Sequence, residues 1–554
     1  MPKARTGRTA PGRHNSHSPD PRCAVALAFE ASELRERGER ARAQELYRQA
    51  ARLDPRLAGA WLGLGLELLE MRDYAEGYRC LLRAVAEADR TLREFPADRP
   101  SHVAQCMANV ALFRPAEAAR SARSALELAP DAKLHSELLF LMNFLPETAP
   151  EDLYAEARRW NSLYTAPLAQ PERPHPNVAD AGRRLKIGYV SPDLYEHPIL
   201  KFLPPVLEFH DPSQFALTLY SVGRKVDART AELPGLVENF VPCPESGAAL
   251  EERVRADEID ILVDLAGHTM PLEYLLVFAR KPAPIQVSWL GLLSTTGLAA
   301  MDYYLGDREM PCPGTEGCFS EALYRLPRAT CCYRSAVDVA VAPAPSLERG
   351  YITFGSFNHP AKIGRDVVKV WSEVLRNVPR SRILLKYWGM ETEVMRDRYQ
   401  GWFSKEGIAR ERVQFAAVSQ TKEYLETYGQ IDIALDPFPY QGGSTTLDTL
   451  LMGVPMVAIS GRLAVQRGTS SILKSAGLAD MVVDSPEQYV KTAISLAAMV
   501  AQDPLLRHNV RKAFQSSPLR DEIGFTRDLE AAYRDMWRIW CRKQPVFSAA
   551  PAQE

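Results

Sequence analysis

Residues 441–448 read Gln-Gly-Gly-Ser-Thr-Thr-Leu-Asp and stand between an apolar, strand-like run at 431–435 and a helical pattern. The first N–H groups of a helix have no partner within the helix, and the helix dipole favours negative charge there. Paired glycines followed by consecutive hydroxyl residues at such a point are typical of a loop that binds a diphosphate. An ordinary loop in which Ser444 or Thr445 caps the helix would use the same residues. The surrounding sequence therefore has to separate the two interpretations.

The carboxy-terminal two thirds of the chain alternates short apolar runs with helical stretches. The runs form two series, the first at 185–190, 216–222, 259–265 and 285–289, and the second at 352–357, 383–387, 413–416, 431–435, 454–459 and 481–483. Strands that alternate with helices indicate parallel sheets with helices on both faces. We therefore predict an α/β part with two Rossmann-like, doubly wound domains. Ligands of such folds bind beyond the carboxyl ends of the strands, here in the cleft between the domains.

Unusual polar and glycine residues gather where these predicted strands end. The segments concerned are 191–198, 267–269, 291–297, 357–362 and the loop at 441–448. Taken singly, each has an ordinary explanation: His197 as a histidine fixed by Pro198, Lys362 as a solvated lysine, and Gly291 as a turn glycine. Their segregation to one end of the predicted sheets favours a common site.

The chemistry of this set suits the transfer of a sugar from a nucleoside diphosphate. Negative charge develops on the departing phosphates, and helix N–H groups with the ammonium of Lys362 can stabilise it without a metal. The acceptor hydroxyl must lose a proton, for which His197 is a candidate base. The sequence has no convincing DxD carboxylate pair at a strand end, so we expect a metal-free site. It also has no GxxxxGK[ST] motif, which argues against a P-loop phosphotransferase.

The amino-terminal third is rich in Ala and Leu and repeats with a period of 34 residues. Ala43, Tyr47 and Ala50 recur 34 residues later as Gly77, Leu81 and Ala84. An irregular third copy, after an insertion, has Ala118, Ala125 and Pro130 at the offsets of Ala43, Ala50 and Pro55. This spacing is the tetratricopeptide signature, in which small residues let paired helices approach closely. A generic helical bundle with chance small residues is the alternative. Such arrays hold a peptide or protein in a concave face, so we expect this third to bind a partner.

Composition excludes several other classes of protein. The 554 residues are 46% hydrophobic and 25% charged with a formal net charge of −2, so no overall basic field for nucleic acid exists. The nine cysteines are scattered without a CxxC pair, which favours free thiols in a reducing compartment. No apolar run approaches the roughly 18 residues of a membrane span. We expect a cytoplasmic protein.

Composition also suggests domain boundaries. Residues 1–22 lack an apolar core and resemble a disordered lead-in rather than a signal peptide. A proline-rich linker is expected at 169–183. The predicted parts are a disordered amino terminus (1–22), a tetratricopeptide-like helical domain (23–168), the linker (169–183), an N-terminal Rossmann-like catalytic domain (184–345), a C-terminal nucleotide-sugar-binding Rossmann-like domain with a closing helix (346–545), and a tail (546–554).

Several blocks of sequence resemble the protein O-linked N-acetylglucosamine transferase family, in particular its tetratricopeptide-bearing SPINDLY-like group in a compact bacterial form. The blocks are Ile-Gly-Tyr-Val-Ser-Pro-Asp at 187–193 with His197-Pro198, Lys-Pro-Ala-Pro-Ile-Gln at 281–286 with Trp-Leu-Gly at 289–291, Met-Asp-Tyr at 301–303, Phe357-Asn358 with Lys362-Ile363, Leu435-Asp436, the loop at 442–448, and Gly-Val-Pro at 453–455. The resemblance extends from Ala24 to Trp540. It implies a glycosyltransferase B arrangement, with the nucleotide held mainly by the second Rossmann-like domain.

The resemblance also implies roles for individual residues. Lys362 resembles the family's diphosphate lysine, Ser444 and Thr445 its phosphate ligands, and Asp448 the carboxylate that binds the ribose. Gly291 matches a glycine of the sugar pocket, and His197 a histidine near the reacting centre. The full predicted set is His197 and Lys362 as catalytic residues, Gly291, Asn358, Lys362, Ser419, Tyr424, Tyr440, Gly442, Gly443, Ser444, Thr445 and Asp448 as donor-binding residues, and His268 and Thr295 as additional candidates, with no metal ligand and no cofactor.

The expected reaction is an inverting transfer of GlcNAc from UDP-GlcNAc to Ser or Thr of a protein bound through the repeats. The chain departs from the family at 291–294, where Gly-Leu-Leu-Ser replaces the usual Gly-Tyr-Pro-Gly, and at Gly443, where a His or Thr is common. It also carries Tyr274 where many bacterial relatives have arginine, and its segment around Ser419 and Tyr424 lacks the Lys and His of animal members. Another donor, such as GDP-fucose or a sugar used in flagellin modification, stays open. A catalytically weak repeat scaffold and a homodimer stay open as well.

Overall fold

The computed structural model describes residues 21–169, 173–417 and 419–544. These residues fall into two compact units, one that ends at Leu112 and one that begins at Phe113. The predicted disordered segment up to residue 20, part of the predicted linker (170–172) and the predicted tail lie outside the described residues. Pro21 and Arg22, which we had placed in the disordered segment, begin the first helix.

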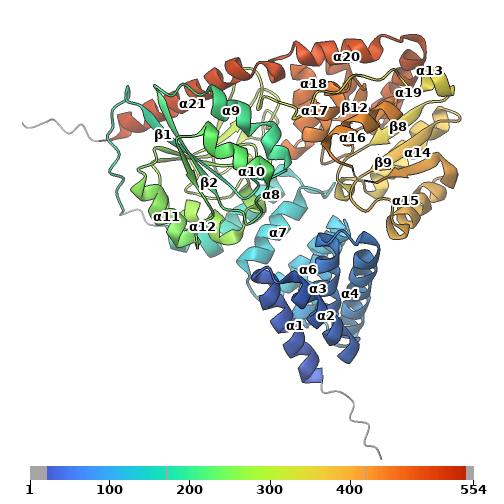
Figure 1. The fold of residues 1–554 in the computed structure, drawn as a ribbon, viewed down its shortest axis with the longest axis horizontal. Helices are drawn as coiled ribbons and strands as arrows, with labels where there is room; N and C mark the ends of the chain where they lie inside the picture. The colour runs from blue at the N-terminus through green and yellow to red at the C-terminus, as the bar shows by residue number, and fades with distance from the viewer. Residues whose placement is uncertain (1–20, 170–172, 418, 545–554) are drawn as a thin grey trace, which may run out of the picture. The chain divides into compact units, whose positions relative to one another are not determined.

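The first unit is entirely helical (Figure 1). Its helices are α1 (Pro21–Glu36), α2 (Arg40–Leu53), α3 (Ala58–Glu70), α4 (Tyr74–Glu94) and α5 (Arg99–Ala111). Successive helices pack in pairs, α1 on α2 and α3 on α4. A Cβ built on Gly65 would lie 3.1 Å from the Gly77 carbonyl oxygen, and a Cβ built on Gly77 would lie 3.2 Å from the Gly65 carbonyl oxygen. The small repeat positions therefore bring two helices into close contact, as a tetratricopeptide-like array requires.

The second unit begins with three further helices. They are α6 (Pro115–Leu128), α7 (Ala132–Met142) and α8 (Pro150–Trp160), followed by a short π-helical turn (Asn161–Thr165) and a 3-10 turn (Ala166–Leu168). Asp131 caps α7, since its carboxylate accepts from the backbone N–H of Leu134 at 3.0 Å. The third repeat copy, on α6, is thus grouped with the part of the chain that follows it.

A seven-stranded parallel sheet follows. Its strands are β1 (Leu185–Ser191), β2 (Phe215–Ser221), β3 (Asn239–Val241), β4 (Ile261–Asp264), β5 (Ile285–Ser288), β6 (Tyr303–Gly306) and β7 (Ala322–Arg325), in the order β3-β2-β1-β4-β5-β6-β7. In the middle of the sheet, Ile187 of β1 pairs with Leu217 of β2 on one side and with Ile261 of β4 on the other. The connecting helices are α9 (Leu203–Phe209), α10 (Ala228–Glu232), α11 (Gly247–Ala256) and α12 (Leu272–Ala279).

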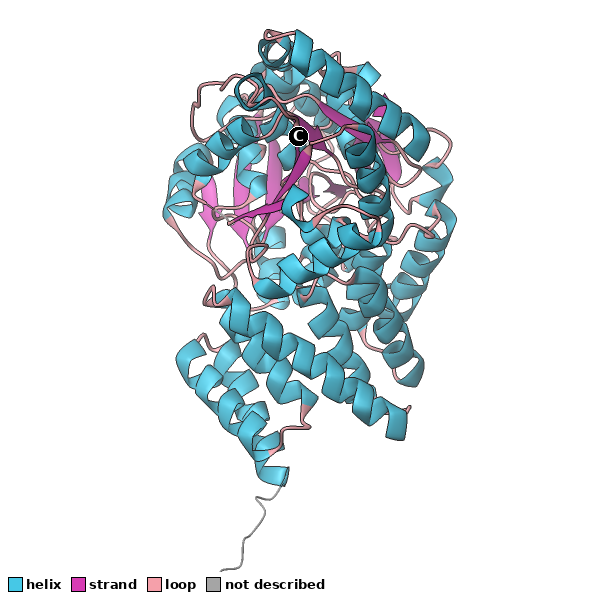
Figure 2. Cartoon of the chain, turned by 90° about the vertical axis from the view of Figure 1, so that its right-hand side faces the viewer, coloured by secondary structure: helices cyan, strands magenta, loops and turns pink. Residues whose placement is uncertain are grey.

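A second parallel sheet has six strands. They are β8 (Thr353–Ser356), β9 (Arg382–Lys386), β10 (Val413–Ala416), β11 (Ile433–Leu435), β12 (Met456–Ile459) and β13 (Val482–Val483), in the order β10-β9-β8-β11-β12-β13. Its helices are α13 (Ser346–Arg349), α14 (Arg365–Asn377), α15 (Glu393–Lys405), α16 (Thr421–Glu426), α17 (Ser444–Leu451), α18 (Gly468–Ser475), α19 (Pro486–Gln502), α20 (Leu506–Gln515) and α21 (Glu522–Lys543). Figure 2 shows the strands of this unit enclosed by helices.

The two predicted series of strands are confirmed. Three strands were missed, namely β3, β6 and β7. β3 has only three residues and is exposed at the sheet edge, and β7 is only partly buried, so neither carries the apolar run that marks a buried strand.

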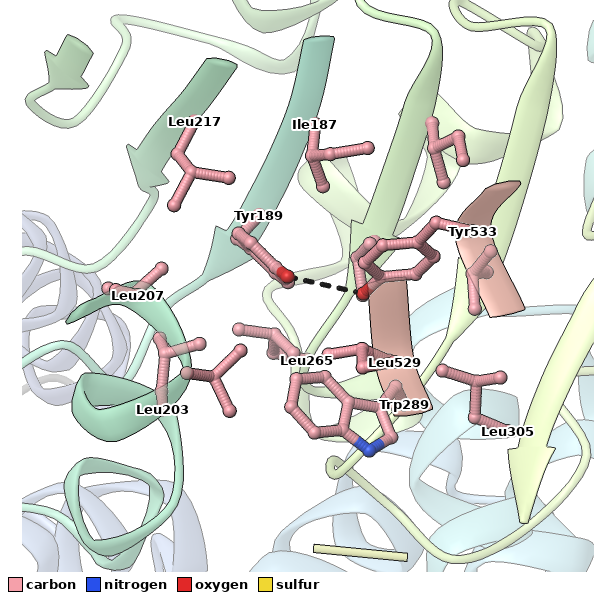
Figure 3. Packing of buried hydrophobic residues seen from close by; sticks show 14 of the residues in the cluster. Ile187, Tyr189, Leu203, Leu207, Leu217, Leu265, Trp289, Leu305, Leu529 and Tyr533 are labelled. Carbon is pink, nitrogen blue, oxygen red and sulfur yellow. Dashed lines mark hydrogen bonds between the residues drawn. The ribbon is translucent and has the colours of Figure 1, made fainter. Parts of the chain in front are cut away.

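The last helix, α21, packs on the first Rossmann-like sheet. Leu529, Tyr533 and Trp537 of this helix are buried in the same core as Tyr189 and Trp289 (Figure 3). The hydroxyl groups of Tyr189 and Tyr533 lie 3.2 Å apart in a hydrogen bond. The helix that closes the chain therefore returns to the first Rossmann-like domain, although sequence order had grouped it with the second.

Candidate donor-binding site

The loop between β11 and α17 forms a cradle of backbone N–H groups. Asp436, directly after β11, accepts a hydrogen bond from the Gly442 N–H at 3.0 Å and so folds the loop back on the strand end. A Cβ on Gly442 would lie 2.6 Å from the Thr446 hydroxyl and 2.8 Å from the Asp436 carboxylate, so only glycine fits there. A Cβ on Gly443, by contrast, would meet nothing within 4 Å. There is therefore room beside Gly443, where α17 begins. The Thr446 and Leu447 N–H groups donate to the Gly443 carbonyl oxygen, and the N–H groups before them have no partner within the helix.

Lys362 reaches this cradle from the end of a different strand. It ends a 3-10 turn (Pro360–Lys362) that follows β8, and its ammonium donates to the Gln441 carbonyl oxygen at 2.7 Å. The same ammonium lies 4.2 Å from the centre of the Tyr440 ring. Phe144, from the loop after α7, contacts the Tyr440 ring at a centroid distance of 4.7 Å. The structure thus brings Lys362, Tyr440 and the glycine loop together.

Burial perturbs the two charged groups of the cradle in opposite directions. It lowers the pKa of Lys362 to about 8, against the attraction of Asp436. It raises the pKa of Asp436 to about 7, against the attraction of Lys362 and the hydrogen bonds that its carboxylate accepts. Among the described residues Lys362 forms no ion pair within salt-bridge distance. Its ammonium is therefore available to an anion.

Hydroxyl and amide groups surround the start of α17. The Thr445 hydroxyl donates to the Asn358 side-chain oxygen at 3.0 Å, and the hydroxyl groups of Thr446 and Thr469 lie 2.7 Å apart. Within the described part of the chain the Ser444 side chain has no hydrogen-bond partner, which leaves it open to a ligand. A small pocket lined by Asn358 and Thr445 lies between the strand ends and α17.

Asp448 lies one turn into α17 and is buried. Its carboxylate accepts from the Lys201 ammonium at 2.6 Å and from the Tyr333 hydroxyl at 2.7 Å. Lys201 belongs to the first Rossmann-like domain, in the 3-10 turn Pro198–Lys201 after β1. The loops beyond the strand ends of the two sheets are therefore in direct contact. A second contact of this kind joins Ser471 of α18 to Asp307, which follows β6, at 2.5 Å.

His197 caps that same 3-10 turn, and its Nδ1 accepts from the Ile199 N–H at 3.4 Å. Burial lowers the pKa of His197, and the nearby Asp193 opposes this shift. The ring is therefore neutral near pH 7, as a general base must be. Asp193 and His197 both follow β1. They precede Lys201, whose ammonium contacts Asp448 of the second Rossmann-like domain.

Gly291 permits a close approach of two backbone segments. A Cβ at this position would lie 2.5 Å from the backbone nitrogen of Ala266, in the turn after β4. That turn is held by the buried Asp264, which accepts from the Ala266 and Gly267 N–H groups at 2.9 Å. The glycine is thus required by packing, whether or not it also contacts a sugar.

His268 and Thr295 have structural roles. The two ring nitrogens of His268 lie 2.7 Å from the Ser136 hydroxyl and 2.9 Å from the Thr296 carbonyl oxygen, and burial lowers its pKa to about 4. The Thr295 hydroxyl donates to Glu321 at 2.7 Å. Both side chains are buried, and their hydrogen-bond partners lie outside the cradle.

The segment predicted to bind the base lies beyond β10. The Ser419 hydroxyl accepts from Lys386 at 3.0 Å. The Tyr424 hydroxyl lies 2.9 Å from that of Tyr428, whose hydroxyl in turn donates to the Thr445 carbonyl oxygen at 3.3 Å. Tyr424 is therefore linked to the cradle through Tyr428, while Ser419 is not.

Sequence reasoning missed Asp436, Lys201, Tyr333 and Phe144 as parts of the site. Asp436 follows a buried strand directly, which is a usable signal. Lys201, Tyr333 and Phe144 come from remote segments, and no local pattern connects them to the loop at 441–448.

Two parallel Rossmann-like sheets whose strand-end loops meet define the glycosyltransferase B class of fold, which a tetratricopeptide-like helical part precedes here. The chain belongs to glycosyl transferase family 41, whose family model matches residues 164–332 and 335–529.

Similar proteins agree with this assignment. The chain is 35% identical over 424 residues to a protein of Petunia hybrida described as a probable UDP-N-acetylglucosamine–peptide N-acetylglucosaminyltransferase SPINDLY, covering 75% of this chain and 45% of that protein. It is 28% identical over 377 residues to the probable transferase SEC of Arabidopsis thaliana, covering 65% and 38%. A solved structure of a mutant of Thermobaculum terrenum O-GlcNAc transferase matches with a TM-score of 0.84 and 34% identity, covering 94% of this chain and 99% of that one.

The chain spans less than half the length of these curated relatives. None of the helices in the described residues is both long and apolar enough to cross a membrane.

Proposed function

We propose that the protein is an inverting, metal-independent O-glycosyltransferase that transfers GlcNAc from UDP-GlcNAc to Ser or Thr of partner proteins. The observation that carries the proposal is the position of the Lys362 ammonium, 2.7 Å from the carbonyl oxygen of Gln441 and beside the loop that begins α17. A cation and unpaired helix N–H groups at one point suit a diphosphate leaving group, because they stabilise its developing charge. The names of the similar proteins support the choice of donor and of a peptide acceptor.

In the proposed reaction the chain's own residues divide the work. The cradle and Lys362 hold the diphosphate, and Asp448 holds the ribose. Neutral His197, across from the cradle, accepts the proton of the acceptor hydroxyl as that oxygen attacks the anomeric carbon and the diphosphate departs. The helical repeats of the first unit recruit the acceptor protein. We propose a cytoplasmic location for this reaction.

A second candidate uses the same fold with a different donor. Gly443 leaves open space at the start of α17, and Leu293 and Ser294 line a separate small pocket with Leu463. Both positions depart from the family pattern noted above, so another nucleotide sugar is a specific alternative. Thermal shifts with UDP-GlcNAc, GDP-fucose and other nucleotide sugars separate the two, because a bound donor stabilises the protein by mass action.

The test of activity is the intact mass of acceptor proteins co-expressed with the enzyme. Addition of one N-acetylhexosamine supports the first candidate, and a different added mass supports the second. No added mass on any acceptor, together with no hydrolysis of any donor, would contradict both and would favour a scaffold without catalysis.

A further inference from the structure

Asp448 is held by two groups that its proposed role as a ribose ligand does not explain. The Lys201 ammonium lies 2.6 Å from one carboxylate oxygen, and the Tyr333 hydroxyl donates to the other at 2.7 Å. Neither donor comes from the Rossmann-like domain that carries Asp448. Lys201 follows the first strand of the first sheet, and Tyr333 lies in the segment that joins the two domains.

The pairing leaves Asp448 able to bind a ligand. A carboxylate taken out of water is costly unless an opposite charge and hydrogen bonds compensate it. Its two oxygens offer about four acceptor sites, and Lys201 and Tyr333 use one on each oxygen. The remaining sites can accept the two adjacent hydroxyl groups of a ribose. Lys201 and Tyr333 therefore fix the orientation of the carboxylate without occupying all of it.

Lys201 and Tyr333 are themselves fixed as a unit. The Arg334 N–H, next to Tyr333, donates to the Lys201 carbonyl oxygen at 2.8 Å. The Tyr333 N–H donates to the Leu519 carbonyl oxygen at 2.9 Å, and the Tyr333 side chain is buried. Lys201 also lies 5.8 Å from the centre of the Tyr424 ring, near the segment predicted to bind the base.

The position of Lys201 also connects Asp448 to His197. Both Lys201 and His197 belong to one short 3-10 turn, which His197 caps and Lys201 ends. An ion pair from this turn to α17 holds the candidate base against the helix that carries the cradle. Loss of the pair would free both the carboxylate and the turn.

We propose that Lys201, supported by Tyr333, is a positioning residue that orients Asp448 toward the ribose of the donor and seats the His197 turn on the donor-binding helix. This proposal rests on the proposed function, because it assumes a nucleoside diphosphate in the cradle. It adds that ribose recognition depends on a residue of the opposite domain.

The test is calorimetric titration of wild-type protein and Lys201→Met with UDP, GDP, 2′,3′-dideoxy-UDP and inorganic pyrophosphate. For the nucleoside diphosphate that wild type binds better, we expect Lys201→Met to weaken binding about tenfold or more, since it leaves a buried carboxylate unpaired. Pyrophosphate uses only the cradle and Lys362, so its affinity should be unchanged. The dideoxy analogue lacks the ribose hydroxyl groups, so wild type and Lys201→Met should bind it equally.

Tyr333→Phe should show the same pattern with a smaller loss of affinity, and Lys201→Arg should restore most of the affinity.

Lys186→Met is the matched control. Lys186 lies near the start of β1, at the opposite end from the site, and pairs with Glu258 on the surface. It should bind every ligand as wild type does. If Lys201→Met binds the ribonucleotide like wild type, or loses pyrophosphate to the same degree, the proposal is overturned. If Lys201→Met does not fold, the affinities of Lys201→Arg and Tyr333→Phe for the ribonucleotide, the dideoxy analogue and pyrophosphate test the proposal in its place. Wild type that binds no nucleoside diphosphate at all would contradict the proposed function instead.

Discussion

The ammonium of Lys362 lies 2.7 Å from the carbonyl oxygen of Gln441, the residue that precedes the glycine pair of the cradle. The two residues are 79 positions apart and follow different strands of one sheet, β8 and β11, which are neighbours. A cation is therefore held beside unpaired helix N–H groups, in a buried environment that strengthens its attraction for an anion.

Donor affinity should fall as the pH rises from 7 to 9. Lys362, with its pKa lowered to about 8, loses its positive charge in this range, and Asp436, with its pKa raised to about 7, gains a negative one. Both changes oppose a diphosphate. Titration of UDP at several pH values measures the effect, and affinity that is constant up to pH 10 would contradict it.

The loss of binding should not reflect unfolding. The pKa of Lys362 is lower in the folded protein than its ordinary value of 10.5. Between these two values the unfolded chain binds more protons, so this group makes stability rise with pH. Thermal unfolding without ligand over the same pH range is the control. In Asp436→Asn, the part of the fall in UDP affinity that occurs near pH 7 should disappear, because residue 436 no longer gains a negative charge there.

Gly442→Ala should destabilise the protein and Gly443→Ala should not. The added methyl group at Gly442 would meet Thr446 and Asp436 at under 3 Å, whereas at Gly443 it would enter open space. Overpacking of this kind costs about 1–3 kcal/mol of unfolding free energy. Chemical denaturation of the two variants measures the difference, and equal stability would show that the loop can relax around the methyl group.

His197→Asn should lose transfer and keep donor binding. Removal of a general base lowers kcat by about 10²–10⁴-fold, while the proposed diphosphate and ribose ligands, the cradle with Lys362 and Asp448, do not include His197. Single-turnover transfer and UDP titration on the same preparation separate the two effects. Full activity in this variant would assign the base to another group.

His268→Leu should lower stability without changing the chemistry. The substitution leaves the buried Ser136 hydroxyl and Thr296 carbonyl oxygen without a partner, which costs about 1–3 kcal/mol. At a temperature where the variant is folded, its kcat and its pH profile should match wild type. A changed pH profile would instead give His268 a direct part in the reaction.

The sequence predicted most of the fold because the strands that matter are buried. Strands such as β4 and β11 are buried along their whole length and read as largely apolar runs, and the loops that follow them hold the unusual residues. Partly exposed edge strands such as β7 lack this signal. The return of α21 to the first sheet is a tertiary choice that the local sequence of the helix does not reveal.

The proximity of Lys362 to the loop at 441–448 was predictable from the sequence, whereas the contacts between the two domains were not. Lys362 and the loop at 441–448 follow strands of one sheet, and the rule that ligands bind at strand ends is enough to join them. The partners of Asp448 are Lys201, in a 3-10 turn, and Tyr333, in the segment that joins the two Rossmann-like domains. Both are more than a hundred residues away, and no periodicity of the sequence predicts such a contact. His268, which its position after a strand made a candidate, has both ring nitrogens engaged by Ser136 and Thr296, and no local pattern predicts these contacts.

The most direct test of the account is UDP titration of Lys362→Met beside Lys369→Met, which removes an exposed lysine from the neighbouring α14. A methionine of similar length keeps the packing on Tyr440 and removes the charge. We predict that Lys362→Met weakens UDP binding about 10²-fold and abolishes detectable transfer, while Lys369→Met behaves as wild type. Wild-type affinity for UDP in Lys362→Met, with the protein folded, would contradict the assignment of the cradle as a diphosphate site.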